Sequence, residues 1–496
     1  MSQPERLILA IDLGTTDVKS GLFTTDGRQV GLVRAGYPTS RSPHGVAEQD
    51  PAAWWAAVVR TTRELVAGLP AGGPSSAATV AAICCVGQGP TLVPADADGR
   101  AVGPAVTWLD TRSAPEVEEL AGLTGRFSWE LGVLPAALHL ERHDPAALAG
   151  ARWYLNAWEA IGCRMTGVAA ETRLVGQLRA NAADVAGSGL RVDRLPPVVA
   201  TGTRLGGLLP GPATELGLPA GTPVVAGMVD AYASFFGAGL LAPGDAVDTG
   251  GTSGGVAIYV DRALAIPGSF CAPAPVDGLW VLGGAMNATG KALDWLGAMI
   301  DPDLGIEALL AEASAIPPGS AGLVFLPYLA GERSPIWDPE ARGAFVGLTL
   351  GHTRGHLVRA VVEAAALALR HVIDPIVAAG ATISELRVSG GPAQSPAWNQ
   401  LKADVTGLPV AVPRVPETAL LGAAITAARG IAVYPDLEAA TRGMVAIERR
   451  LQPDPAARTV YDEVYAIYVG LYPALASTFH RLGTLEDRAG GPLPRA

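Results

Sequence analysis

The chain has 496 residues, which is too long for one ordinary hydrophobic core, so we expect two large domains flanking a cleft. Its 47 acidic residues outnumber 36 basic ones and give a net charge of -11. This charge argues against a chain built to neutralise nucleic-acid phosphates or an anionic membrane. No stretch reaches the roughly 18 uncharged apolar residues of a membrane-spanning helix. We therefore expect a cytoplasmic protein that binds neither nucleic acid nor membranes.

The four cysteines predict no metal centre and no disulfide framework. Cys84 and Cys85 are adjacent, and Cys163 and Cys271 are isolated. This spacing lacks the C-x-x-C pairs of a zinc site and the even distribution of a stapled secreted domain. Reduced, buried thiols are the favoured interpretation.

The first elements in chain order are predicted to be strands. Residues 7–37 contain three apolar runs separated by short turns, which predicts a three-stranded meander. Asp50-Pro51 then predicts the start of a helix that continues to about Leu69. The later apolar patterns predict strands over 79–86, 104–109 and 386–388, and helices over 357–379, 396–407 and 417–429.

The first hairpin is echoed half a chain later. Residues 10–23 read AIDLGTTDVKSGLF, and residues 246–259 read AVDTGGTSGGVAIY. Each reads as a hairpin with an acid at the end of its first strand. The spacing predicts two related domains with a boundary near residues 241–244.

The two Gly-Thr turns are candidate phosphate sites. Small residues let backbone N–H groups converge on one spot, and hydroxyls add further donors. An acid in such a turn would repel a phosphate unless a divalent cation lies between them, and magnesium prefers this combination of oxygens. Asp12 is therefore a candidate magnesium ligand, and Thr15, Thr16, Thr252 and Ser253 are candidate phosphate contacts. The alternative is that both segments are plain hairpin turns.

Three other motifs compete for these segments. Residues 14–20 imitate a P-loop but are followed by a strand pattern, and residues 284–292 have one residue too many between their glycines. Residues 251–255 match the G-x-S-x-G of a serine hydrolase, with Ser253 as its nucleophile. The VAIYV that follows is strand-like, whereas a nucleophile elbow leads into a helix. A serine hydrolase remains the rival class.

Asp230 is the candidate catalytic acid. It lies in VVAGMVDAYASFFGAG, between an apolar strand and a small-residue helix. Phosphoryl transfer to an alcohol needs a carboxylate that accepts the hydroxyl proton. A helix N-cap is the alternative role for this residue. Asp110 and Arg112, in TWLDTR, either bind sugar hydroxyls or form an ion pair with each other.

Five motifs in this order resemble the FGGY carbohydrate kinases, the family of xylulokinase, gluconokinase, ribulokinase and glycerol kinase. GAFVGLTLGHTRGHLVRAVVE, residues 343–363, matches the family's second signature throughout. The resemblance runs from about Leu7 to Gly430. The supporting stretches are FLPYLAGERSPIWDPEARG, SGGPAQSPAWNQLKADVTGLPV, EQDPAAWW and WLDTR.

The resemblance implies an α/β fold of two ribonuclease-H-like, actin-like ATPase domains, spanning residues 1–242 and 243–485, with a disordered tail over 486–496. It implies ATP and Mg²⁺ as cofactors and a small-molecule sugar as partner. The expected reaction transfers the γ-phosphoryl group to a terminal hydroxyl of a pentulose such as D-xylulose, as in xylulokinases. A homodimer and closure of the two lobes are also expected.

The resemblance also assigns site residues. Asp230 corresponds to the general base and Asp12 to the magnesium-side acid. The substrate contacts would be Gln88, Trp108, Asp110, Arg112 and Asp230. The nucleotide and phosphate contacts would be Thr15, Thr16, Lys19, Thr252, Ser253, Gly290, Asp294, Gly390, Gly391 and Ser395.

Departures from the family pattern fall mainly on the sugar side. Ala136 and His139 stand where the first signature has a Lys and a Trp, and residues 87–90 keep the Gln of the substrate loop without its His. Ala231 follows the catalytic Asp in place of an amide, and NAWEA at 156–160 replaces a lysine-aspartate stretch. Hydroxyl recognition depends on such groups. Ribulose, gluconate and a glycerol-like polyol therefore remain alternative substrates, and a non-catalytic sugar sensor remains an alternative function.

Overall fold

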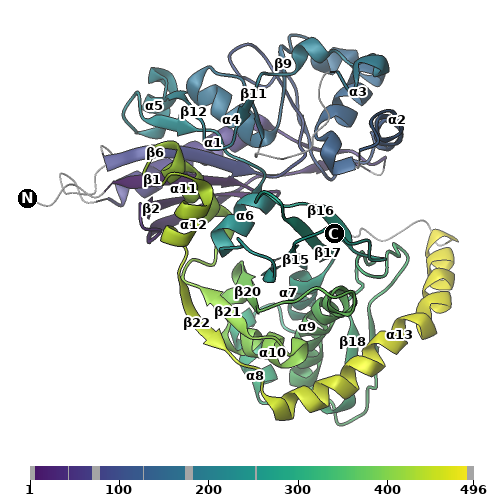
Figure 1. Ribbon diagram of the computed structural model, residues 1–496. Coiled ribbons are helices and arrows are strands. Elements are labelled where there is room, and N and C mark those ends of the chain that lie inside the picture. Colours follow the sequence, from purple (N-terminus) through teal and green to yellow (C-terminus); the bar gives the residue numbers. More distant parts are fainter. Residues whose placement is uncertain are drawn as a thin grey trace, which may run out of the picture. The chain divides into compact units, whose positions relative to one another are not determined.

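A computed structural model describes residues 6–42, 44–69, 79–126, 128–173, 183–251 and 254–488. The chain divides by its internal contacts into two units (Figure 1). Unit 1 comprises Met1–Gly239 and Glu417–Val445, and unit 2 comprises Leu240–Pro416 and Ala446–Ala496.

Unit 1 is built on a six-stranded sheet with the order β12-β13-β6-β1-β2-β3. The predicted meander is confirmed, because β1, β2 and β3 pair antiparallel in sequence order. β6 pairs parallel with β1, and β13 pairs parallel with β6. The strand bounds are β1 Leu7–Leu13, β2 Asp17–Thr24, β3 Gln29–Gly36, β6 Val80–Gly87, β12 Arg204–Gly207 and β13 Pro223–Val225.

Helices cover both faces of this sheet, which is why β1 is apolar along almost its whole length. Leu9, Ile11 and Leu13 share one core with helices α1 (Pro51–Ala67) and α4 (Ala157–Thr166). Helix α11 (Thr418–Gly430) packs against β1 and β6. Leu420 of this helix lies so close to β2 that a Cβ on Gly21 would be 2.7 Å from its Cδ2. Residues 417–445 therefore pack in unit 1, whereas the expected division assigns them to the second domain.

The rest of unit 1 contains shorter elements. Helices α2 and α3 pack around a separate small core that includes Leu120 and Leu138. The strand expected over 104–109 is only two residues long. The remaining bounds are β4 Ser40–Arg41, β5 Ala47–Gln49, β7 Val93–Ala95, β8 Ala105–Val106, α2 Ala114–Thr124, α3 Leu134–His143, β9 Trp153–Leu155, β10 Glu171–Arg173, β11 Val198–Ala200, α5 Pro210–Leu216, α6 Asp230–Ala238 and α12 Leu437–Met444.

Unit 2 is built on a seven-stranded sheet with the order β16-β17-β15-β14-β20-β21-β22. The strand bounds are β14 Asp245–Thr249, β15 Gly254–Val260, β16 Phe270–Pro273, β17 Trp280–Met286, β20 Glu385–Ser389, β21 Val410–Pro413 and β22 Ile447–Leu451, with a separate hairpin of β18 Val324–Leu326 and β19 Ala344–Val346. The helix bounds are α7 Thr289–Ile300, α8 Ile306–Ser314, α9 Arg354–Ala378, α10 Pro396–Thr406 and α13 Pro455–Arg488.

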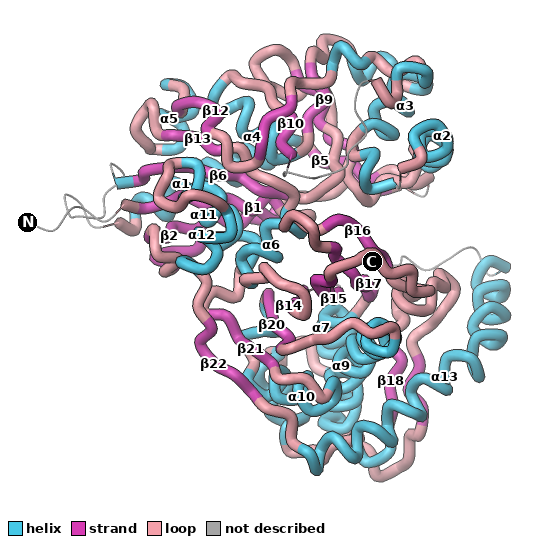
Figure 2. Tube along the Cα trace, viewed as in Figure 1, coloured by secondary structure: helices cyan, strands magenta, loops and turns pink. Residues whose placement is uncertain are grey.

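The two sheets repeat one strand order. In unit 1 the central strands run β3-β2-β1-β6-β13, and in unit 2 they run β17-β15-β14-β20-β21. In each unit, neighbours among the first three of these strands pair antiparallel. The fourth strand pairs parallel with the third, and the fifth pairs parallel with the fourth (strands magenta in Figure 2). The echo between the two hairpins thus reflects a repeated fold, and the expected α/β class with two ribonuclease-H-like domains is confirmed.

Most predicted helices are confirmed, and one long helix was not assigned from sequence. Helix α13 extends to Arg488, so residues 486–488 of the expected tail are helical, and residues 489–496 lie outside the described residues. All four cysteines are free, and Cys271 alone among them is not fully buried. Within the described ranges, no helix combines the length and the apolar character needed to cross a membrane.

Candidate active site

Asp12 lies in unit 1 beside a chain of charged groups. It pairs in register with Lys19 across the first hairpin, and its Oδ2 is 3.9 Å from Lys19 Nζ. Lys19 Nζ is also 2.9 Å from Glu417 Oε2, and Glu417 forms a further ion pair with Arg34. Burial lowers the pKa of Lys19, but Asp12 and Glu417 outweigh it and hold that pKa above its ordinary value. Glu417, which belongs to a segment 400 residues away, thus completes this group.

The Asp12 carboxylate is suited to a cation. Burial, together with the nearby carboxylates of Asp230 and Glu417, raises the pKa of Asp12 to about 7, and Lys19 opposes the shift. Its Oδ1 is buried and has no hydrogen-bond partner within the described part of the chain. A buried oxygen without a partner is costly, and a divalent ion with oxygen ligands would satisfy it. The donor set therefore fits Mg²⁺.

The echoed acid of unit 2 lies in a different setting. Asp248 occupies the corresponding strand β14, and its Oδ2 is 2.5 Å from Lys402 Nζ. Both side chains are buried. This lysine neutralises Asp248, whereas Lys19 is held further from Asp12 and is shared with Glu417. Of the two related acids, Asp12 is the one with a buried oxygen that lacks a hydrogen-bond partner among the described residues.

Asp230 is the first residue of helix α6. Its Oδ1 accepts a hydrogen bond from the N–H of Ala231 at 2.7 Å. Burial raises the pKa of its carboxyl, and this N–H and Lys19 partly offset the rise. The N-cap of this helix is Val229. Asp230 therefore does not have the N-cap role that was the alternative for it. A half-buried carboxylate with a raised pKa is a stronger proton acceptor than an exposed one.

A neutral hydrogen-bonding group lies near the first hairpin. Trp108 donates from Nε1 to Thr15 Oγ1 at 3.0 Å. Gln49 donates to the Thr15 carbonyl at 2.7 Å and accepts from Gln88 Nε2 at 2.7 Å. Gln88 Oε1 is buried and has no hydrogen-bond partner among the described residues. Trp108 is 44% exposed, so its indole presents a partly open surface.

Gln49 was not among the residues predicted from sequence. It ends strand β5, one residue before the Asp50 cap of helix α1, and Trp54 donates to its Oε1 at 3.0 Å. The signal available in the sequence was its place in the EQDPAAWW stretch, which supported the family resemblance without marking Gln49 as a contact.

Asp110 and Arg112 are bonded mainly to each other. The Arg112 guanidinium donates to both oxygens of Asp110 and, at 2.5 Å, to Glu48 Oε1. Asp110 Oδ2 also accepts from the Ala47 N–H at 2.9 Å. The structure therefore places these two residues in an ion pair that ties the segment after β8 to strand β5.

The predicted nucleotide residues of unit 2 gather around a cavity of about 740 Å³. This volume lies in the range of ordinary small-molecule sites. The start of helix α7 contributes Gly290 and Asp294, and Ser395 is the N-cap of helix α10. The remaining walls combine glycine and apolar residues with two polar side chains, Glu307 and Gln394: Gly251, Leu293, Ile306, Glu307, Leu310, Gly391, Pro392, Gln394, Pro396 and Trp398. Helix N-termini favour anions such as phosphate.

Gly390 does not line this cavity but shapes the turn beside it. Its φ is 74°, and a Cβ added there would lie 2.0 Å from the Gly250 carbonyl oxygen. Only glycine allows this close approach of two turns. Thr252 and Ser253, the predicted phosphate contacts that follow Gly250 in the chain, lie outside the described residues.

The element that follows this turn bears on the serine hydrolase alternative. Gly254 begins strand β15, which pairs antiparallel with β14. A nucleophile elbow requires a helix at that point. The G-x-S-x-G match is therefore accidental in structural terms. The P-loop reading of residues 14–20 fails for the same reason, since β2 begins at Asp17.

The predicted site residues thus fall into two groups. Asp12, Lys19 and Asp230 in unit 1 lie within electrostatic reach of one another, and Trp108 bonds to Thr15. The second group surrounds the cavity of unit 2. Thr16 is exposed in the turn between β1 and β2, and its carbonyl accepts from the Tyr37 N–H.

Comparisons with known proteins agree with this architecture. Models of the FGGY family of carbohydrate kinases match residues 7–135 with their N-terminal domain and residues 246–431 with their C-terminal domain. The xylulose kinase of Bacillus subtilis is 29% identical over 487 residues, which covers 94% of this chain and 97% of that protein. The gluconokinase of the same organism is 28% identical over 518 residues, with 97% and 98% covered. The crystal structure of xylulose kinase from Rhodospirillum rubrum has a TM-score of 0.77 at 31% identity and covers 96% of this chain and all of that one.

Proposed function

The chain belongs to the FGGY family of carbohydrate kinases, and from that premise we propose that it phosphorylates a neutral pentulose such as D-xylulose at a terminal hydroxyl. It is an ATP-dependent sugar kinase, a phosphotransferase whose acceptor is an alcohol group. Relatives that match nearly the whole chain carry the names xylulose kinase and gluconokinase. The question for this chain is therefore the charge and shape of the acceptor.

The observation that favours a neutral sugar is the pairing of the cations. Within the described part of the sugar-side group, Arg112 is bound to Asp110 and Glu48, and Lys19 lies between Asp12 and Glu417. Arg112 is thus already paired with carboxylates, and Lys19 is assigned to the phosphates, so neither is left to balance the carboxylate of a sugar acid. The free hydrogen-bonding atom is instead the neutral Gln88 Oε1, which suits a sugar hydroxyl.

In the proposed reaction, Asp230 accepts the proton of the attacking hydroxyl. Burial raises the pKa of its carboxyl, which strengthens it as a base, and the Ala231 N–H and Lys19 partly offset the rise. Trp108 packs against the sugar and Gln88 accepts a hydroxyl hydrogen bond. Asp12 would hold Mg²⁺, and the ion would supply positive charge to offset that of the phosphoryl group in transfer.

The nucleotide is proposed to occupy the cavity of unit 2. Its phosphates would lie toward the glycine turns and the first residues of helices α7 and α10, with contacts from Gly290, Asp294, Gly390, Gly391 and Ser395. In unit 2, Thr252 and Ser253 are proposed as further phosphate contacts. In unit 1, Thr15, Thr16 and Lys19 are proposed as the phosphate contacts of the first turn.

The test is a coupled ADP-release assay with Mg²⁺-ATP and a panel of D-xylulose, D-ribulose, glycerol and gluconate, run on the wild-type protein and on Asp230→Asn. We expect the highest kcat/KM with a pentulose, and we expect Asp230→Asn to lower kcat roughly 10²–10⁴-fold while nucleotide binding is retained. Asp436→Asn is the matched control, because this acid also starts a helix but caps α12, which carries none of the proposed contacts, and asparagine caps equally well.

Each part of the proposal can fail separately. A preference for gluconate would overturn the neutral-pentulose assignment and leave the kinase assignment intact. A mildly impaired Asp230→Asn would remove Asp230 as the base. Sugar binding without any turnover would favour the sugar sensor.

A further inference from the structure

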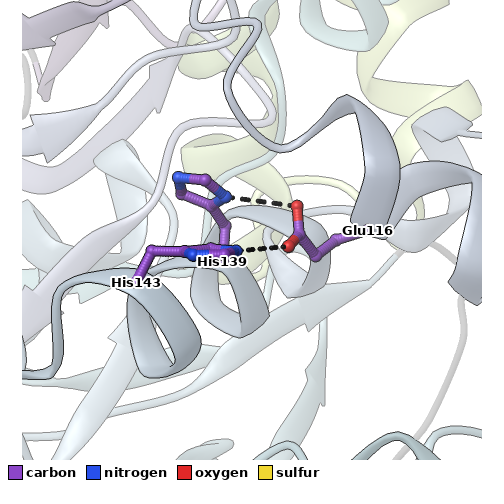
Figure 3. A group of neighbouring side chains, drawn as sticks. All are labelled: Glu116, His139 and His143. Atoms are coloured by element: carbon purple, nitrogen blue, oxygen red, sulfur yellow. Dashed lines mark hydrogen bonds and ion pairs between the residues drawn. The ribbon is translucent and has the colours of Figure 1, made fainter.

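Unit 1 contains a group of two histidines and one glutamate that the kinase reaction does not use. Glu116 belongs to helix α2, and His139 and His143 are one turn apart on helix α3. Figure 3 shows both imidazole rings directed at the same carboxylate. His139 Nδ1 is 3.2 Å from Glu116 Oε2, and His143 Nε2 is 3.4 Å from Glu116 Oε1.

We propose that Glu116, His139 and His143 form a binding site for a divalent transition-metal ion of the zinc type. Imidazole nitrogen and carboxylate oxygen are the ligands that zinc takes beside thiolate, and two histidines with one carboxylate make up a known three-ligand set. This site is independent of the proposed sugar and nucleotide contacts.

The distances fit such an ion. Two ligand atoms that each lie about 2.1 Å from a tetrahedral metal are roughly 3.4 Å apart. The two histidine-to-carboxylate separations, 3.2 and 3.4 Å, are close to this value, and the three ligand atoms lie within 4.8 Å of one another. No other group of three His, Cys, Asp or Glu side chains meets this distance limit in the described ranges of the chain.

Burial and charge also favour the site. The Glu116 side chain is 3% exposed, so its charge calls for compensation, while His143 is 60% exposed and gives an ion access from solvent. Arg142 is the cation nearest in sequence to these ligands. Both of its terminal nitrogens bond to Glu119, which reduces the repulsion it would exert on a metal.

The site brings together elements from two separate segments. His139 is one of the departures noted in sequence, where the family signature has a Trp, and Glu116 lies 23 residues earlier in the chain. A metal bound by all three would cross-link α2 to α3. Because α2 directly follows the segment that carries Trp108 and Arg112, the ion would stiffen the region next to the proposed sugar contacts.

The experiment is a Zn²⁺ titration of the full-length protein by calorimetry, with excess Mg²⁺ present to occupy carboxylate sites that lack imidazole. We expect one ion to bind per chain and to raise the melting temperature. His143→Gln should weaken zinc binding roughly tenfold or more and abolish the thermal shift. Because His143 is exposed, this variant removes a ligand without disturbing the core.

The matched control is His352→Gln. His352 and His356 form another close histidine pair, with ring centroids 5.2 Å apart, but the Nδ1 atom of each ring accepts a backbone N–H. Loss of His352 should leave zinc affinity unchanged. Equal affinities for wild type and His143→Gln, or a loss confined to His352→Gln, would overturn the proposal.

Cobalt provides a readout that does not depend on affinity. Co²⁺ bound by two imidazoles and a carboxylate in a tetrahedral arrangement gives intense visible absorption, whereas hexa-aquo Co²⁺ is nearly colourless. We expect this band in the wild type and in His352→Gln and its loss in both His143→Gln and Glu116→Gln. Its presence in Glu116→Gln at full strength would show that the carboxylate is not a ligand.

Discussion

Glu332 shows at the scale of one residue how burial sets a proton equilibrium in this protein. Its side chain is buried in unit 2, and its Oε1 accepts from the N–H groups of Asn287 at 2.9 Å and Arg333 at 2.8 Å. Burial raises the pKa of this carboxyl to about 7, although both N–H groups and the Arg333 charge oppose the rise. The folded protein therefore binds this proton more tightly than the unfolded chain does.

The predicted consequence is a loss of stability as the pH rises. Since the pKa is raised on folding, the contribution of Glu332 is complete below about pH 4.5 and is lost as the pH passes through about 7, by up to about 3 kcal/mol. Glu332→Gln keeps an acceptor but cannot ionise. Urea unfolding from about pH 5 to pH 8 should show a smaller decline for this variant than for the wild type. The same decline in both would contradict the assignment, and the exposed Glu463→Gln serves as control.

The candidate site was predictable from sequence only where its residues are local. The turn containing Asp12 and the strand-to-helix junction at Asp230 carry their signals in a few adjacent letters. Their ion-pair partners carry no such local signal. Glu417, which pairs with Lys19, lies 398 positions further along the chain, and Lys402, which pairs with Asp248, belongs to another element. Such pairings depend on tertiary packing, which periodicity does not encode.

At the scale of elements, the contact between helices α6 and α11 depends on two glycines. A Cβ on Gly422 would lie 2.0 Å from the Ala233 carbonyl oxygen, and a Cβ on Gly237 would lie 1.8 Å from the Thr418 carbonyl oxygen. Backbone atoms cannot move aside as a flexible side chain can. The two helices approach each other this closely because neither carries a side chain at the contact.

Gly422→Ala is therefore expected to destabilise the protein by about 1–3 kcal/mol, despite the higher helix propensity of alanine. The control is Gly122→Ala in helix α2, where an added Cβ meets nothing within 4 Å. That change should be neutral or should stabilise by about 0.5–1 kcal/mol. Thermal or urea unfolding of both variants measures the difference. A neutral Gly422→Ala would mean that the helices can separate without cost.

Elements with strong local patterns were predicted correctly, whereas their assignment to a unit was not predictable. The helix over residues 417–429 was expected from its apolar period, and α11 confirms it. Its buried face, which includes Leu420, Leu421 and Ile425, contacts strands from the opposite end of the sequence. Periodicity identifies a buried face but does not identify the surface that covers it.

At the scale of the whole molecule, the chain passes between the units three times. It leaves unit 1 after Gly239, returns at Glu417 and leaves again after Val445. The close contact of Gly237 with Thr418 places the first two crossings near each other on unit 1. Unit 1 is therefore one domain made from two distant segments.

This path predicts that unit 1 can fold without the inserted segment. Residues 6–239 joined to 417–445 through a flexible linker of about six residues should form a monomer with a cooperative thermal transition, because α11 and α12 still cover the sheet. Residues 6–239 alone should aggregate or remain partly unfolded, since the apolar surface under α11 is exposed. Circular dichroism and size-exclusion chromatography distinguish the two. Equal folding of both would show that α11 is dispensable.

The distribution of the cysteines has a practical consequence for measuring motion. Burial raises the pKa of the Cys84 and Cys85 thiols and raises that of Cys163 to about 11, so all three resist alkylation at neutral pH. Cys271 in β16 is the partly exposed thiol. A maleimide dye would thus attach mainly to unit 2 of the native protein. One engineered surface cysteine in unit 1 would then give a donor and acceptor pair, with which single-molecule energy transfer can follow the units as sugar and nucleotide bind.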